Sequence, residues 1–140
     1  MAVADRLRPT LLRLGRELRQ ERIAGVSPHQ VGLLISIKYA PGVTVGRLAA
    51  EERVSTAAMS KRVSRLERDG LVARTQSEAD RRRIGLTLTE DGQRTLRRVR
   101  SRRTAWLASR LGALSPDELA AVGAAAEPLA RLLEGEVARA

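Results

Sequence analysis

The residues best suited to bind a polyanion lie in one expected helix, between Ser55 and Asp69. Its polar face carries short side chains and then long cations: Ser55, Thr56, Ala57, Ser60, Lys61, Ser64, Arg65 and Arg68. Short side chains allow a helix to approach the edges of DNA bases, and the cations behind them can reach phosphates. Met59, Val63 and Leu66 fall on the opposite face, so we expect them to pack inward. The pattern predicts a helix for the major groove; an ordinary amphipathic helix with a solvated face is the alternative.

A second group of charges, Asp80, Arg81, Arg82 and Arg83, lies at the tip of an expected hairpin. Three adjacent arginines repel one another, whereas a narrow minor groove concentrates negative potential and favours them. Asp80 comes two residues before Arg82, and we expect its carboxylate to hold the Arg82 guanidinium in one pose through a charge-assisted hydrogen bond. The tip therefore predicts a contact with the minor groove. A flexible charged loop is the alternative.

The elements that position these residues follow from capping residues and hydrophobic spacing. Ser27, Thr44 and Ser55 each precede a helical pattern that they can cap. The expected order is a helix that ends at Pro41-Gly42, a short helix after Thr44, a corner at Glu52-Arg53-Val54, the helix to Asp69, and strands at Leu71–Thr75 and Ile84–Leu88. Helices followed by a ribbon in this order are typical of a winged helix-turn-helix, which we predict for residues 27–92.

Further helices are expected on both sides of this region. At about residues 5–24 a narrow leucine seam runs among arginines, and Pro9 predicts that the regular helix starts near Arg8. Thr89 is expected to cap a long helix that reaches about Leu111, and Ser115 is expected to cap the last helix. The seams consist of Leu7, Leu11, Leu14 and Leu18 in the first helix and of Leu119, Val122, Leu129, Leu132, Leu133 and Val137 in the last.

These seams hold more apolar surface than a winged domain of this size can cover, so the simplest partner is a second copy of the chain. We therefore interpret residues 5–24 and 93–140 as dimerisation helices of a single domain that spans residues 1–140. The sequence contains no internal repeat.

Composition supports a nucleic-acid partner. The chain has 26 basic against 16 acidic residues, a net charge of +10, which points to a polyanion, with DNA favoured over a membrane surface. A high-GC coding sequence would explain arginine in place of lysine, but not the excess of cations. The sequence has no apolar run near 18 residues and its start does not resemble a secretory signal, so a soluble cytoplasmic protein is expected.

Enzymatic chemistry is poorly supported. The sequence has one histidine, no cysteine, no glycine-rich phosphate loop and no carboxylate pair set among buried residues by its spacing. Without cysteine, disulfides, zinc-cysteine sites and thiol sensing are excluded. We expect no catalytic residue, no metal and no cofactor.

The motifs together resemble the MarR family of bacterial transcriptional regulators. The resemblance is carried by Ser55 to Val72, by Asp80-Arg81-Arg82 and by the run from Leu88 to Gly92. It implies a mainly α fold with a small β-ribbon, in which a winged helix-turn-helix lies between N- and C-terminal dimerisation helices. It further implies that Arg82 is the wing arginine, Asp80 its orienting acid and Arg65 a backbone-contacting cation. Arg53 departs from the family, where a small turn residue, often glycine, is usual.

The resemblance also implies an effector cleft between the dimer helices and the winged region. Arg103 falls within an apolar stripe, where an unpaired charge would be costly, so it needs a carboxylate or a ligand anion. The candidate cleft residues are Arg13, Arg16, His29, Tyr39, Arg103 and Trp106, and their basic character favours a small anionic aromatic effector. An interfacial ion pair for Arg103 and an ordinary solvated position for His29 are the alternatives.

The sequence thus predicts a regulator that binds double-stranded DNA sequence-specifically, as a homodimer on a pseudo-palindromic operator, acting as a repressor that a small ligand releases. One rival is a non-specific architectural protein of the nucleoid type. A second rival is a protein-interaction module that has kept the fold and lost DNA. The three wing arginines argue against this second rival, since no protein partner demands them.

Overall fold

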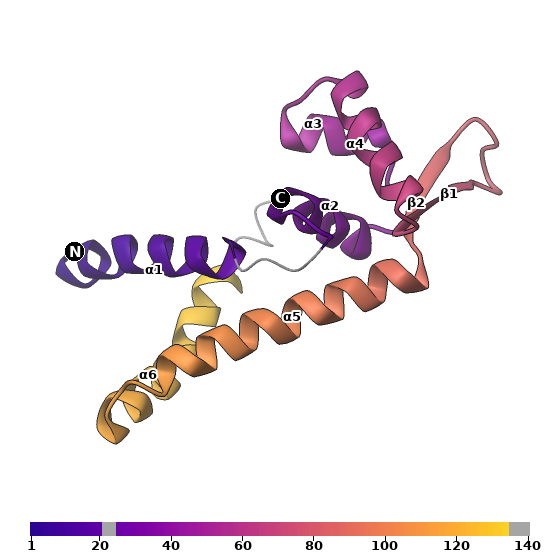
Figure 1. Cartoon of the computed structure of the whole chain (residues 1–140). Helices are drawn as coiled ribbons and strands as arrows, with labels where there is room; N and C mark the ends of the chain where they lie inside the picture. Colours follow the sequence, from indigo (N-terminus) through magenta and orange to yellow (C-terminus); the bar gives the residue numbers. More distant parts are fainter. Residues whose placement is uncertain (21–24, 135–140) are drawn as a thin grey trace. The chain divides into compact units, whose positions relative to one another are not determined.

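A computed structural model describes residues 1–20 and 25–134, which form six helices and one two-stranded antiparallel sheet (Figure 1). The elements are α1 (Ala2–Gln20), α2 (Pro28–Tyr39), α3 (Val45–Glu52), α4 (Thr56–Arg68), β1 (Val72–Gln76), β2 (Ile84–Leu88), α5 (Glu90–Leu111) and α6 (Pro116–Glu134). The chain divides into two compact units, residues 1–103 and residues 104–140. The predicted fold class, mainly α with a small β-ribbon, is confirmed.

The first unit contains the hydrophobic core. Side chains from α2, α3, α4, both strands, the first half of α5 and the loops before α3 and β1 form one cluster: Val31, Leu33, Leu34, Ile37, Val43, Leu48, Ala49, Met59, Val63, Leu66, Leu71, Val72, Leu86, Leu96 and Val99. The expected inward face of α4 is confirmed, because Met59, Val63 and Leu66 are each 0% exposed. Full burial of a large aliphatic side chain contributes about 1.5–3 kcal/mol. This core therefore fixes which face of α4 remains free.

The helix starts are fixed by short-range capping, as predicted. Ser27 accepts a hydrogen bond from the backbone nitrogen of Gln30, whose side chain accepts one in return from Ser27. Ser55 Oγ accepts from the backbone nitrogen of Ala58 at 3.0 Å, and Thr44 caps α3 in the same manner. Each such cap stabilises its helix by about 0.5–2 kcal/mol.

Arg53 forms the corner between α3 and α4. Its backbone is left-handed, with φ 55° and ψ 43°. Glycine adopts this conformation without steric cost, whereas a side chain with a Cβ does not. The left-handed backbone thus explains why a small residue, often glycine, is expected at this corner.

The two strands form the expected ribbon. Their register runs from Val72 opposite Leu88 to Gln76 opposite Ile84. The first strand was expected at Leu71–Thr75 and in fact starts one residue later, because Leu71 donates its backbone N–H to the carbonyl of Leu66 and so belongs to the turn after α4. A bridge between Val43 and Leu86 joins the ribbon to the loop before α3. The ribbon is therefore anchored to the helical core.

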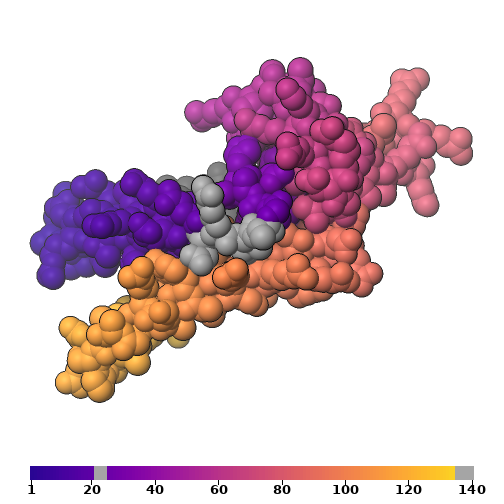
Figure 2. All heavy atoms as spheres, viewed as in Figure 1, coloured from indigo at the N-terminus to yellow at the C-terminus, as the bar shows by residue number. Residues whose placement is uncertain are grey.

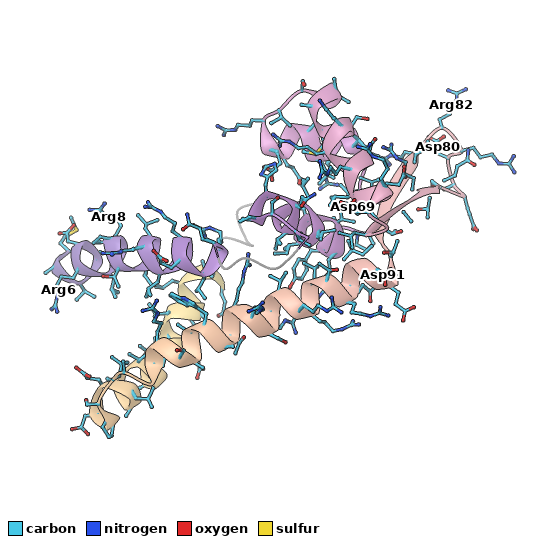
Figure 3. All side chains as sticks on the ribbon, in the orientation of Figure 1. Arg6, Arg8, Asp69, Asp80, Arg82 and Asp91 are labelled. Atoms are coloured by element: carbon cyan, nitrogen blue, oxygen red, sulfur yellow. The ribbon has the colours of Figure 1, made fainter. Side chains whose placement is uncertain are left out.

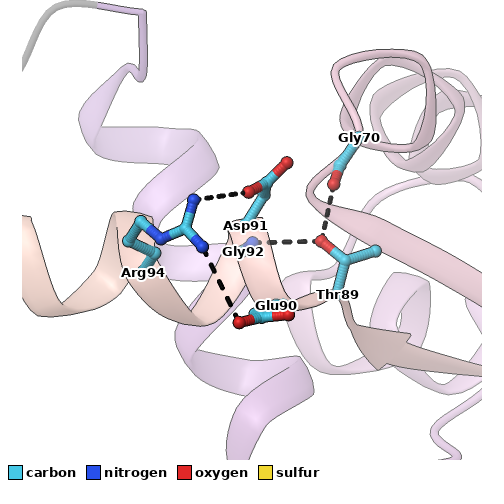
Figure 4. A network of polar contacts seen from close by, with 6 residues as sticks. All are labelled: Gly70, Thr89, Glu90, Asp91, Gly92 and Arg94. Carbon is cyan, nitrogen blue, oxygen red and sulfur yellow. Dashed lines mark hydrogen bonds and ion pairs between the residues drawn. The ribbon is translucent and has the colours of Figure 1, made fainter.

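Thr89 connects the start of α5 to the end of α4 (Figure 4). Its hydroxyl donates to the carbonyl oxygen of Gly70 at 2.5 Å and accepts from the backbone nitrogen of Gly92 at 3.0 Å. Gly92 is buried, and a Cβ there would collide with the carbonyl oxygen of Leu71. Arg94 pairs with Asp91 on the solvent side of the same turn. The cap predicted for Thr89 is confirmed.

Helix α1 corrects one expectation. It starts at Ala2, not near Arg8, and Pro9 lies inside it. The missing N–H of Pro9 leaves the carbonyl of Asp5 without its helical partner, and that cost is moderate because Asp5 is exposed to solvent. The expected end of this helix, at about residue 24, lies outside the described residues. No residue of α1 is buried.

The described part of the second unit contains the end of α5, the turn after it and α6. Helix α5 ends at Leu111 as predicted, and Ser115 and Glu118 form the expected reciprocal cap of α6, at 3.2 and 2.8 Å. No residue of α6 is buried, and its seam is exposed at Leu119, Val122, Leu132 and Leu133 (45%, 46%, 69% and 70%). Val137 lies outside the described residues. Across residues 1–20 and 25–134, none of the helices has the length and apolar character needed to cross a membrane.

Candidate nucleic-acid interface

Most residues that the sequence assigned to the polar face of α4 are exposed to solvent. Thr56, Ala57, Lys61 and Arg65 are exposed, as is the cap Ser55. Ser60 and Ser64 are half-buried and lie on the flank of this face. The polar face of α4, as used below, consists of Ser55, Thr56, Ala57, Ser60, Lys61, Ser64 and Arg65. All seven candidates lie on one side of the helix or at its cap, because the opposite side is held in the core.

The loop between β1 and β2, residues 77–83, extends away from the helices of the winged region (Figures 1 and 2). It is closed by hydrogen bonds from Ser77 N to Arg83 O and from Arg83 N to Asp80 O, both 2.9 Å. The Gln76 side chain donates to the carbonyl of Arg81 at 2.5 Å. The tip, which we call the wing, is thus a hydrogen-bonded turn with its side chains directed outward.

Asp80 acts on the backbone of the wing and not on the Arg82 guanidinium. Its Oδ1 accepts a hydrogen bond from the backbone nitrogen of Arg82 at 3.0 Å. The predicted bond to the guanidinium is absent from the described residues, which corrects that expectation. A carboxylate two residues before an N–H closes a local turn at little entropic cost, so the backbone takes the acceptor that the guanidinium was expected to use. The Arg82 side chain projects from the wing (Figure 3).

The wing is strongly cationic. Arg81, Arg82 and Arg83 are all exposed, and none of them forms an ion pair within the part of the chain that the structure describes. Their three charges repel one another and outnumber the two carboxylates of the same loop, Glu78 and Asp80, so an anionic partner would be favourable.

One contact between α4 and the ribbon escaped the sequence reasoning. Arg74 of β1 donates from Nε to Glu67 Oε2 at 3.1 Å and from Nη2 to Ser64 Oγ at 3.3 Å. Both acceptors lie on α4, and Ser64 belongs to its polar face. The sequence offered one signal for this contact: Arg74, in a strand, follows Glu67, in a helix, by seven residues across a tight turn.

The candidate effector residues lie on three helices. Arg13 and Arg16 are exposed on α1, and His29 and Tyr39 are exposed near the two ends of α2. Arg103 and Trp106 are half-buried on α5. Arg103 Nε is buried and has no hydrogen-bond partner among the described residues, in line with the expected need for a counter-charge. A single cleft lined by all six residues stays a prediction.

Arg110 follows Arg103 by seven residues on α5, so helical spacing places it in the same stripe. Its guanidinium carbon lies 5.2 Å from the centre of the Trp106 ring. This distance is within the range of a cation–π contact, worth about 0.5–1 kcal/mol at an exposed site. Arg110 therefore has a partner on its own helix.

Comparison with known proteins assigns the family. A sequence profile of the MarR family matches residues 24–83. The chain is 35% identical over 95 residues to the HTH-type transcriptional repressor MdtR of Bacillus subtilis, a match that covers 68% of this chain and 61% of that protein. The chain belongs to the MarR family. It is therefore a DNA-binding transcriptional regulator and not an enzyme.

Solved structures of MarR-type regulators match nearly the whole chain. The transcriptional regulator Tm0710 of Thermotoga maritima superposes with a TM-score of 0.82 at 25% identity, covering 98% of this chain and 97% of that one. FabT of Streptococcus pneumoniae, solved in complex with DNA, has a TM-score of 0.57 at 26% identity and covers 96% and 94%. The winged-helix architecture of this MarR-family chain is thus shared along its length.

Proposed function

We propose that this MarR-family protein is a homodimeric repressor that reads a pseudo-palindromic operator and is released by a small ligand. The observation that carries the proposal is the pairing of the polar face of α4 with the arginine-rich wing in one folded unit. The major groove admits one helix, and the narrow minor groove attracts arginine. The name of its relative MdtR, a transcriptional repressor, supports repression over activation.

Within this proposal, reading and positioning are separate tasks. Ser60 and Lys61 lie near the N-terminal half of α4 and contact base edges, while Arg65 and Arg68 contact phosphates. Arg82 enters the minor groove from the wing, flanked by Arg81 and Arg83. Asp80 shapes the wing by holding its backbone.

The homodimer is supported by exposed apolar seams. Leu7, Leu11 and Leu14 of α1 are 36%, 44% and 39% exposed, and the leucines near the end of α6 are more exposed still. Contiguous apolar surface of this kind is unfavourable in water and marks an interface. A two-fold dimer presents two copies of α4, which matches an operator made of two inverted half-sites.

Release by a ligand requires that the ligand favour a dimer shape in which the two α4 helices no longer match successive major grooves. Its leverage is limited to its differential affinity for the two shapes. The guanidinium groups of Arg13, Arg16 and Arg103 favour an anionic aromatic compound, such as a phenol or a carboxylate, and Arg103 Nε has no hydrogen-bond partner among the described residues.

The proposal is tested by separating sequence preference from general affinity. Ser60→Ala or Lys61→Ala should change which half-site is preferred. Arg65→Gln or Arg68→Gln should weaken binding to all sequences alike and lower the slope of log K against log salt by about one each. If all four variants keep the same sequence preference, the architectural rival is favoured instead.

The proposed release from DNA by a small ligand is tested by a separate experiment. Phenolic and carboxylate compounds are screened by thermal shift of the free protein and by titration of the protein–operator complex. An effector should stabilise the free dimer and weaken DNA binding, and linkage requires the same coupling factor in both directions. A compound that stabilises the protein with no effect on DNA affinity is a ligand without a regulatory role.

A further inference from the structure

Arg74 joins the strand that leads to the wing with the side of α4 that carries Ser64. Its guanidinium reaches two acceptors on that helix, Glu67 Oε2 at 3.1 Å and Ser64 Oγ at 3.3 Å. The side chains of Arg74 and Glu67 are only 31% and 42% exposed. This ion pair spans two elements, unlike the pair between Arg94 and Asp91, which lies within one helix. It is therefore suited to fix the angle between β1 and α4.

The contact also uses part of the hydrogen-bonding capacity of Ser64, because its hydroxyl oxygen accepts from Arg74. A serine hydroxyl has one hydrogen to donate, and its oxygen accepts here from Arg74. Helical serines often donate back to the carbonyl four residues earlier, as Ser36 does to Gly32 at 3.1 Å. Ser64 makes no such bond within the described ranges, so its hydrogen is available to an acceptor beyond the helix.

DNA supplies such acceptors next to a major-groove helix. Phosphate oxygens, purine N7, guanine O6 and thymine O4 all accept, whereas the amino groups of adenine and cytosine only donate. Because one of the two lone pairs of Ser64 Oγ already accepts from Arg74 while its hydrogen is not used within the described residues, Ser64 would favour an acceptor over an amino group. Because Glu67 compensates the charge of Arg74, Arg74 itself is directed to the helix and not to a phosphate.

We infer that Arg74 is a positioning residue, which fixes Ser64 as a donor to DNA and sets the wing relative to α4 without contacting DNA itself. The inference rests on the proposed DNA-reading role of α4 and the wing. It differs from the simplest electrostatic interpretation, in which every arginine near the interface binds a phosphate. The two accounts predict different salt dependence and opposite effects of removing Glu67.

The first experiment measures operator affinity of full-length variants over a range of salt concentrations. Arg74→Gln should weaken binding roughly five- to tenfold, as for the net loss of one hydrogen bond, while the salt slope stays unchanged. Arg65→Gln, the phosphate-contact control, should lower the slope by about one. A slope that falls by about one in Arg74→Gln would show a direct phosphate contact and overturn the inference.

Glu67→Gln provides a gentler variant that keeps the shape of the side chain. Positioning predicts weaker operator binding, because Arg74 loses its charged partner. A phosphate-binding Arg74 predicts tighter binding, because a competing negative charge has been removed from the interface. Tighter binding would therefore also overturn the inference.

A double-mutant cycle tests the link to the wing. In the Arg74→Gln background, Arg82→Ala should cost clearly less than in the wild type, because the wing is already misplaced. In an Arg94→Gln background its cost should be unchanged. If the losses of operator affinity in Arg74→Gln and Arg82→Ala simply add, Arg74 does not position the wing, and the proposed function is unaffected. If neither Arg65→Gln nor Arg82→Ala weakens binding, the proposed function fails, and this inference fails with it.

Discussion

Helices α4 and α6 each carry one apolar face, but only that of α4 is buried. Met59, Val63 and Leu66 of α4 are each 0% exposed, whereas Leu132 and Leu133 of α6 are 69% and 70% exposed. The two helices have similar patterning and opposite environments. The difference shows that the pattern of a helix predicts that a face will be covered but does not identify what covers it.

For α4 the covering elements are local. The helix follows α3 after a three-residue corner and precedes β1 after a tight turn, so its neighbours in sequence are also its neighbours in space. The face of α6 has no equivalent cover among the described residues of its own unit. In our account a second copy of the chain covers it, and each leucine buried there would contribute about 1.5–3 kcal/mol.

The largest expected effect is therefore on assembly. Deletion of residues 115–140 should abolish the homodimer and give a monomer or an aggregate, because the remaining apolar seam of α1 loses its cover. Sedimentation velocity measures the outcome. A truncated chain that sediments as a well-folded dimer would place the interface elsewhere.

A point-mutant pair keeps this test independent of folding. Leu132→Gln combined with Leu133→Gln should shift the monomer–dimer equilibrium and leave helical content unchanged. The matched substitution in the other helix, Leu66→Ala, should lower the free energy of unfolding by about 2–5 kcal/mol, since it opens a cavity in the core. If the α6 double variant and Leu66→Ala lowered the free energy of unfolding equally, the apolar face of α6 would belong to the core of the chain and not to an interface.

The next effect concerns DNA contacts. Arg82→Ala should cost about 1–3 kcal/mol of operator binding with the fold intact. Asp80→Ala should also weaken binding, because the backbone hydrogen bond to Arg82 is lost, although the substitution removes a negative charge near DNA. Fluorescence anisotropy measures both. A gain in affinity for Asp80→Ala would show that charge outweighs the shape of the wing.

A smaller effect is expected at the corner before α4. Arg53→Gly should raise the free energy of unfolding by about 0.5–1 kcal/mol, because relief of the left-handed conformation exceeds the entropy cost of glycine. Urea denaturation measures the change. A destabilised variant would indicate that the Arg53 side chain makes a contact worth more than the strain.

The smallest expected effect is that of oxidation. The chain has no cysteine, and its methionines are Met1 and Met59. Met59 is 0% exposed and Met1 is fully exposed at the chain start, so mild peroxide should leave operator binding nearly unchanged. A gel-shift titration with and without peroxide measures this. Release of DNA by mild peroxide would contradict the proposed ligand switch.

Much of the fold could be predicted because its signals are local. Ser27, Ser55 and Thr89 cap helices through hydrogen bonds within three residues, and such chemistry is legible in sequence. The buried face of α4 followed from helical spacing alone. The predicted start of α1 was wrong because the helix tolerates Pro9: the carbonyl of Asp5, which lacks its helical N–H partner, is exposed to solvent.

The candidate site was predicted less completely, for a physical reason. The polar face of α4 and the wing follow from residue type, but the partner of Asp80 depended on competition between a guanidinium and a nearby backbone N–H. The contact from Arg74 to Ser64 spans ten residues and depends on how β1 packs beside α4. Such contacts are set by tertiary geometry, which no local pattern contains.

The central claim is that this MarR-family chain reads DNA sequence and does not merely bind charge. The direct test selects bound sequences from a random library and then measures competition between the selected operator and random duplex DNA at physiological salt. The account predicts a preference of roughly a thousandfold or more for the operator. Nearly equal affinity for the two DNAs would contradict it and favour an architectural protein.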